Sequence, residues 1–142
     1  MKARVKWVEA QRFIGGSGSG HGVIMDASAT PDGETTLGPS PMEMLLLGMG
    51  GCTVYDVVSI LKKMRLSVDD VFVEMEAERA EEPPKVFTKI HAQFTVVGDV
   101  PLAKAAEAVS LSADKYCSAS RMFAETAEIT HGVTVIVESP DA

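Results

Sequence analysis

The chain of 142 residues is 46% hydrophobic and carries 20 acidic against 13 basic side chains, a net charge of −7. That length predicts a single domain, residues 1–142, which can bury a core without disulfides. The acidic balance argues against nucleic acid or an anionic membrane as partner, since both need clustered positive charge. The N-terminus does not resemble a signal peptide and no apolar run has the length of a membrane-spanning helix. We therefore expect a cytoplasmic protein whose two cysteines stay reduced.

The N-terminal part of the chain predicts three short strands. Residues 2–9 alternate, with Val5 and Trp7 on one face, which is typical of a half-buried strand. Residues 12–14 and 22–26 predict two more strands around the sequence "GGSGSGH". No helix pattern follows that sequence, which favours a hairpin tip over a phosphate-binding loop. Residues 27–39 are small, polar and rich in turn formers, so we expect a mobile loop there.

A long central helix is predicted from the serine at position 40 to about Met64. Ser40 and Glu43 form the sequence pattern of a capping box, and Pro41 suits the first helical position. Almost every position up to Lys62 is apolar or small. We therefore expect this helix to be covered on most of its sides.

Three glycines, Gly48, Gly50 and Gly51, precede Cys52 within this helix. Each glycine costs a helix interior ~1 kcal/mol relative to alanine. Either another backbone packs closely against them, or a reagent must reach the thiol. By itself, Cys52 also fits a small buried hydrophobic residue. Asp56 lies one turn later, where it would raise the pKa of the thiol if both face the same way, or pair elsewhere.

The second half of the chain predicts a long hairpin, two helices and a final strand. Residues 71–79 and 86–98 alternate as two strands with one wet face, a helix follows Pro101, and residues 129–137 form the last strand. Cys117 lies at or just before the start of the second helix, a position that stabilises a thiolate. The order βββ–α–ββ–αα–β predicts an α+β fold with antiparallel pairing around the central helix. The histidines show no metal-ligand spacing, so no metal site is expected.

The two cysteine segments together resemble a known family. "SPMEMLLLGMGGCTVYDVVSILKK", which contains Cys52, and "DKYCSASRMF", which contains Cys117, resemble the paired motifs of the OsmC/Ohr family, and "VKWVE" and "KYCS" are most similar to its YhfA-type branch. The resemblance implies a thiol peroxidase for organic hydroperoxides, built as an intertwined homodimer. It implies that Cys52 is the peroxidatic cysteine and Cys117 the resolving one. An external dithiol would be the reductant, with no cofactor.

The resemblance also implies that Glu43 orients an arginine over the reactive thiol. Glu43 and Cys52 differ by ~13 Å along one helix axis, so Glu43 is expected to serve the thiol of a second subunit. The family's arginine lies in the early hairpin, where residues 15–22 contain none; Arg12 and Arg79 are the candidates. A non-enzymatic dimer that senses oxidants or binds a small apolar ligand is the alternative. A guanidinium close to the Cys52 sulfur would favour the enzyme.

Overall fold

A computed structural model describes residues 1–28 and 36–137 of the chain. Its elements follow the predicted α+β order, with one additional π-helix turn: β1 (Ala3–Glu9), β2 (Arg12–Ser17), β3 (Gly22–Asp26), α1 (Pro41–Lys63), β4 (Asp70–Arg79), β5 (Phe87–Val97), α2 (Leu102–Leu111), η1 (Ser112–Tyr116), α3 (Ser118–Phe123) and β6 (Glu128–Ile136). The chain divides into two compact units, residues 1–47 and 48–142. The single domain expected for residues 1–142 stays a prediction.

The first unit contains the antiparallel sheet β1-β2-β3. Its β2–β3 connection is a hairpin tip, in which the Ser17 N–H donates to the His21 carbonyl at 2.9 Å. The expectation of a half-buried first strand is wrong, because all seven residues of β1 are exposed. Alternation placed Val5 and Trp7 on one face correctly, but the described part of this unit does not cover that face. The loop predicted over residues 27–39 lies largely outside the described residues.

Helix α1 begins with the predicted capping box. The Glu43 carboxylate accepts the Ser40 N–H at 2.7 Å, and the Glu43 N–H donates to the Ser40 hydroxyl at 3.2 Å. Hydrogen bonds from the Ser40 backbone and then its side chain hold the pKa of Glu43 below its usual value. The helix start is therefore fixed by local chemistry, independently of any further role of Glu43.

One face of α1 is buried, which is less cover than expected. The buried positions repeat at helical spacing: Met49, Gly50, Thr53, Val57 and Leu61. Leu45, Leu47 and Tyr55 stay exposed. By length and composition α1 is also apolar enough to cross a membrane, so the expectation that no segment reaches that length is wrong. A single such helix is weak evidence, because core helices pass the same test.

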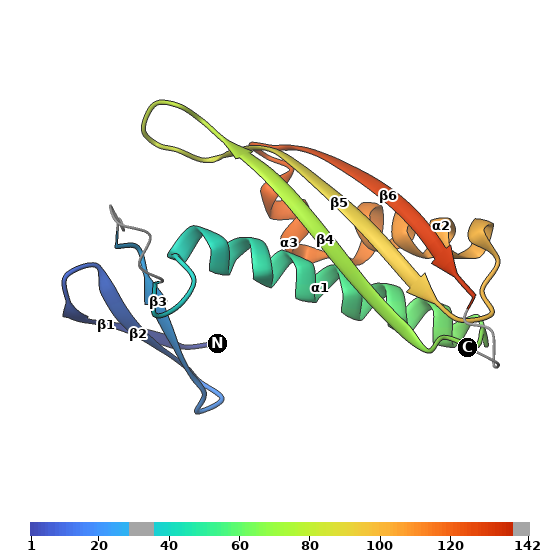
Figure 1. Cartoon of the computed structure of the whole chain (residues 1–142), viewed down its shortest axis with the longest axis horizontal. Helices are drawn as coiled ribbons and strands as arrows, with labels where there is room; N and C mark the ends of the chain where they lie inside the picture. The colour runs from blue at the N-terminus through green and yellow to red at the C-terminus, as the bar shows by residue number, and fades with distance from the viewer. Residues whose placement is uncertain (29–35, 138–142) are drawn as a thin grey trace. The chain divides into compact units, whose positions relative to one another are not determined.

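The second unit contains the sheet β4-β5-β6 with helices on one face (Figure 1). β4 and β5 pair antiparallel, whereas β5 and β6 pair in parallel. The expected antiparallel pairing is thus wrong for β5–β6, because the crossover through α2, η1 and α3 returns the chain to the starting end of β5. The core contains Val57, Leu61, Val71, Ala92, Phe94, Val96, Val100, Ala105, Ala108 and Val109.

Candidate active site: a pair of cysteines

Cys117 is positioned by the junction between η1 and α3. Its backbone is extended, with φ −73° and ψ 105°, and it caps α3 by accepting the Ser120 N–H on its sulfur at 3.3 Å. The Cys117 N–H donates to the Ser112 carbonyl at 2.8 Å, which closes the wider π-helical turn. π-helical turns of this kind often occur at functional sites. The sequence-based placement of Cys117 just before a helix is confirmed.

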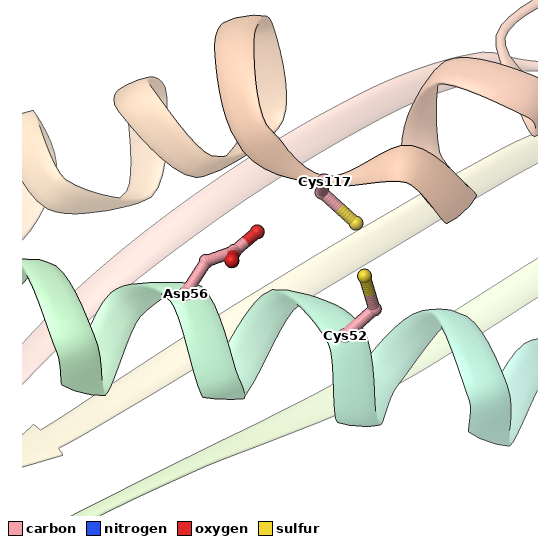
Figure 2. A group of neighbouring side chains, drawn as sticks. All are labelled: Cys52, Asp56 and Cys117. Carbon is pink, nitrogen blue, oxygen red and sulfur yellow. The ribbon is translucent and has the colours of Figure 1, made fainter.

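Cys52 and Cys117 come together within the second unit, although they are far apart in the sequence. Figure 2 shows the two sulfurs pointing toward each other, Cys52 from α1 and Cys117 from the opposite helical segment. The two Sγ atoms and a carboxylate oxygen of Asp56 all lie within 4.8 Å of one another. Both cysteines are free, Cys52 half-buried and Cys117 only 2% exposed. This arrangement suits disulfide formation with a small local shift.

The thiol of Cys117 is not activated in the way its helix position suggested. Burial, the largest effect, raises its pKa, and Cys52 raises it further; the side chain and N–H of Ser120 act in the opposite direction. The expectation of a stabilised thiolate is therefore wrong for the isolated chain. Desolvation outweighs the contribution of α3, a helix of six residues.

Asp56 faces the cysteine pair (Figure 2), which is one of the two placements left open by the sequence. The Ser112 hydroxyl donates to its Oδ2 atom at 3.2 Å, so Asp56 is held by a neutral donor rather than by an ion pair. Ser112 is 1% exposed and carried no recognisable signal in the sequence. Only its position in the folded turn reveals that it binds Asp56 with its hydroxyl and Cys117 with its carbonyl.

The three side chains also offer ligand atoms for a cation, but no fourth His, Cys, Asp or Glu joins them within residues 1–28 and 36–137. A cavity of about 430 Å³ opens beside Asp56. Tyr55, Tyr116 and Lys63 also line it. The Asp56 side chain therefore approaches both thiols, and Asp56 also lines a space that a small molecule can enter.

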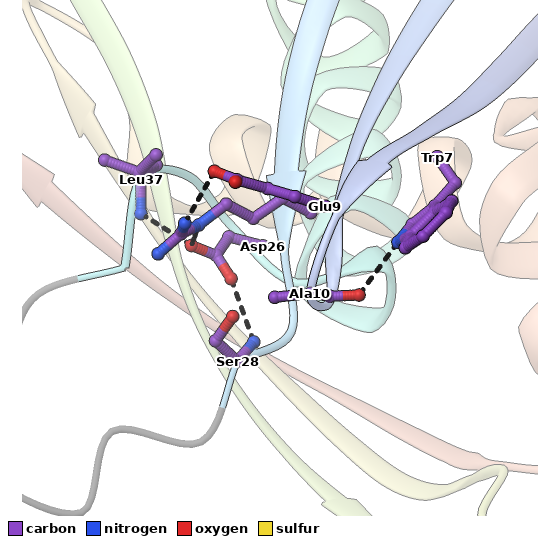
Figure 3. A network of polar contacts seen from close by, with 7 residues as sticks. Trp7, Glu9, Ala10, Asp26, Ser28 and Leu37 are labelled. Atoms are coloured by element: carbon purple, nitrogen blue, oxygen red, sulfur yellow. Dashed lines mark hydrogen bonds and ion pairs between the residues drawn. The ribbon is translucent and has the colours of Figure 1, made fainter.

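Arg12, one of the two candidate arginines, is engaged inside the first unit. Its Nε donates to Asp26 at 3.1 Å and its NH1 group to Glu9 at 3.0 Å. Asp26 also accepts the N–H groups of Ser28 and Leu37, at 2.9 and 3.0 Å (Figure 3). The Ser28 side chain, followed by the Leu37 and Ser28 N–H groups, lowers the pKa of Asp26 far below its usual range. Asp26 therefore acts as the polar anchor of this unit.

Arg79, the other candidate, donates from Nε to the Lys85 carbonyl at 2.9 Å. Among the described residues of the second unit, the Arg79 guanidinium does not hydrogen-bond the Cys52 sulfur. Glu43 lies at the start of α1, in the first unit, and its action on a second subunit stays a prediction. The structure thus brings together Cys52 and Cys117 of the predicted site, with Asp56 and Ser112 added.

The fold and the paired cysteines define an α+β protein with a dithiol site, and comparisons identify its family. The protein-family model described as "OsmC-like protein" matches residues 31–132 of this chain. Protein YhfA of Escherichia coli is 48% identical over 137 residues, which cover 96% of this chain and 98% of that protein. The chain therefore belongs to the OsmC-like protein family, and the resemblance noted from its motifs is confirmed.

Solved structures share this fold. A hypothetical protein from Aquifex aeolicus has a TM-score of 0.84 at 28% identity, with 97% of both chains covered. A structure from Legionella pneumophila, described as an organic hydroperoxide resistance protein OsmC, has a TM-score of 0.72 at 15% identity, with 94% of this chain and 96% of that chain covered. The second likeness shows the fold alone.

Proposed function

We propose that the protein is a thiol peroxidase that reduces organic hydroperoxides. The observation that carries this proposal is the meeting of two free cysteine sulfurs from distant segments in one partly accessible site. Family membership supports a redox role, and the description of the Legionella relative suggests organic hydroperoxides as the substrate class. No cofactor is needed, because the sulfur atoms accept the oxygen and pair with each other.

In the proposed reaction, the Cys52 thiolate attacks the distal oxygen of the hydroperoxide, giving the sulfenic acid of Cys52 and an alcohol. Cys117 then forms a disulfide with Cys52 and water leaves. A dithiol reductant restores both thiols by exchange. The difference in exposure supports this division of roles, since Cys52 is half-buried whereas Cys117 is almost inaccessible.

The proposed enzyme is a cytoplasmic homodimer, in which Glu43 of one subunit helps to orient an arginine over the Cys52 thiol of the other. The exposed apolar residues of β1 and α1 support a dimer, because Val5, Trp7, Leu45 and Leu47 would otherwise contact water. Nucleic acid and membranes are not proposed as partners. The net charge of −7 supports that part of the proposal.

The test is hydroperoxide consumption with a dithiol present, comparing cumene hydroperoxide with hydrogen peroxide. The wild-type protein is expected to prefer cumene hydroperoxide. Cys52→Ser should consume neither, because a serine hydroxyl does not ionise near neutral pH. Without the dithiol, Cys117→Ser should consume one equivalent per site and leave Cys52 as sulfenic or sulfinic acid, because no second thiol forms the disulfide. A stoichiometric burst in Cys52→Ser, with none in Cys117→Ser, would reverse the assignment.

A second candidate function is a non-enzymatic redox sensor that uses the same two cysteines. The engagement of Arg12 with Asp26 and of Arg79 with Lys85 favours it, since an unactivated thiol reacts slowly. Turnover separates the two functions. A sensor forms the disulfide between Cys52 and Cys117 once, at a rate far below that of a peroxidase, and shows no preference for organic hydroperoxides in steady state.

A further inference from the structure

Asp56 is the acidic group that faces both sulfurs, and the reaction described above leaves it without a role. It lies one helical turn after Cys52 on α1, so both side chains leave the same face of that helix. One of its oxygens lies within 4.8 Å of each sulfur. A carboxylate in this position can exchange a proton with either cysteine after a small movement.

Ser112 holds Asp56 and Cys117 in a fixed relation. Its hydroxyl donates to Oδ2 of Asp56 at 3.2 Å, while its carbonyl accepts the N–H of Cys117 at 2.8 Å. The residue is 1% exposed, so water does not compete strongly for either group. One buried serine thus orients the carboxylate and fixes the backbone that carries the second thiol.

The disulfide-forming step needs a proton acceptor and then a proton donor. The nucleophile in such a step is a thiolate, yet Cys117 is 2% exposed and burial raises its pKa. The hydroxyl that leaves the Cys52 sulfenic acid must in turn receive a proton to depart as water. The Ser120 N–H already donates to the Cys117 sulfur, but an amide N–H does not accept the thiol proton.

We propose that Asp56 carries the proton of the Cys117 thiol to the hydroxyl that leaves Cys52. This proposal rests on the function proposed above. The Cys117 sulfur, which is oxidised, forms the S–S bond, and the S–O bond of the Cys52 sulfenic acid breaks as that sulfur is reduced. The proton passes from Cys117 to the carboxylate and then to the departing oxygen, so one water is released and Asp56 ends as it began. The cavity beside Asp56 receives the water.

The test separates the two chemical steps in the full-length protein. Reduced protein is mixed with one equivalent of cumene hydroperoxide and quenched at intervals. Mass spectrometry follows the sulfenic acid, after trapping with dimedone, and the cross-linked peptide that joins Cys52 and Cys117. Asp56→Asn keeps a carbonyl oxygen for the Ser112 hydroxyl but cannot take up a proton. It should form sulfenic acid within twofold of the wild-type rate and form the disulfide about 100-fold more slowly.

Three further variants distinguish proton transfer from a structural effect. Asp56→Glu should recover much of the disulfide rate, because it restores a carboxylate. Ser112→Ala, which keeps the carbonyl bound to Cys117 and removes only the hydroxyl, should slow the same step several-fold. Asp114→Asn, an exposed position on η1, should leave both steps unchanged. Disulfide formation in Asp56→Asn at or above the wild-type rate would overturn the proposal.

The disulfide step can also be tested if the protein is not a peroxidase. If the wild-type protein consumes no cumene hydroperoxide catalytically, millimolar hydrogen peroxide is used to form the Cys52 sulfenic acid chemically. The same disulfide step is then timed in the wild type and in Asp56→Asn. A loss of about 100-fold in that step would support proton transfer by Asp56 in a sensor, and equal rates would reject it.

Discussion

The two units of the chain differ in how they bury their apolar residues. Residues 48–142 enclose a core in which Phe94, Val57 and Leu61 are 1%, 0% and 0% exposed. In residues 1–47, Trp7 and Val5 remain 64% and 61% exposed, and the anchor of the unit is the buried carboxylate of Asp26. The second unit can therefore be stabilised by its own hydrophobic core, whereas the first unit by itself leaves an apolar surface exposed.

The largest expected effect lies in the core of the second unit. Phe94→Ala should lower the free energy of unfolding by about 3–5 kcal/mol, because it removes a fully buried aromatic side chain and leaves a cavity. Phe72→Ala is the matched control on β4, where the ring is 41% exposed, and should cost under about 1 kcal/mol. Urea unfolding at one protein concentration measures both. Equal losses of unfolding free energy in the two variants would mean that Phe94 does not lie in the core of the second unit.

The next effect concerns the apolar face of the first unit. Because this surface is predicted to be covered in a homodimer, Val5→Asp should raise the dimer dissociation constant by at least about tenfold. Lys6→Asp changes the charge more strongly but lies on the opposite face of β1, so it should have little effect. Sedimentation equilibrium is the measurement. A wild-type protein that sediments as a folded 15.1 kDa monomer at micromolar concentration would contradict the dimer itself.

A smaller effect should appear in acid, at the anchor of the first unit. The pKa of Asp26 is lower in the folded state than in the unfolded state. Its contribution to the free energy of unfolding is therefore complete above the unfolded pKa of about 4, and it is lost as the pH falls toward the pKa of the folded state. Asp26→Asn should therefore reduce the urea midpoint at pH 7 and reduce it less at pH 3. Asp99→Asn, at an exposed turn, is the control. If the difference in urea midpoint between the wild type and Asp26→Asn grows as the pH falls, Asp26 is not a charged anchor.

Much of the fold was predictable from local patterns. The alternation in β5 correctly assigned Ile90, Ala92, Phe94 and Val96 to the buried face, because a strand side chain has only two directions to point. The capping box at Ser40 was also predictable, because it depends only on residues three positions apart in the sequence. Alternation did not reveal that β1 is uncovered, because a pattern shows which residues share a face and not what packs against it.

The remaining errors come from interactions between distant segments. The direction of β6 beside β5 depends on where the crossover delivers the chain, which no strand pattern encodes. The pKa of Cys117 depends on a competition between desolvation and a helix terminus, and only the folded chain shows that burial is larger. Ser112 was missed because a π-helical turn has no periodic signature. The motifs located both cysteines, while the partners of those cysteines required the fold.

The smallest expected effect tests the glycines before Cys52, where the two units meet in sequence. A Cβ built on Gly50 would lie 2.6 Å from the terminal carbon of Met75, so that side of α1 is already occupied by β4. A Cβ on Gly51 meets nothing within 4 Å. In an isolated chain, Gly51→Ala should therefore stabilise the helix by ~1 kcal/mol.

In the predicted dimer, Gly51→Ala should be destabilising instead of stabilising, because the missing side chain is expected to let a second helix approach closely. Gly51→Ala should then raise the dimer dissociation constant severalfold, even though each chain gains helix propensity. Gly50→Ala is the matched control and should leave that constant unchanged, since its Cβ displaces only the flexible end of Met75. Sedimentation equilibrium and urea unfolding on the same samples separate the two contributions. If Gly51→Ala is simply more stable by ~1 kcal/mol with unaltered association, the face of α1 that carries Gly51 is exposed to solvent and does not contact a second helix.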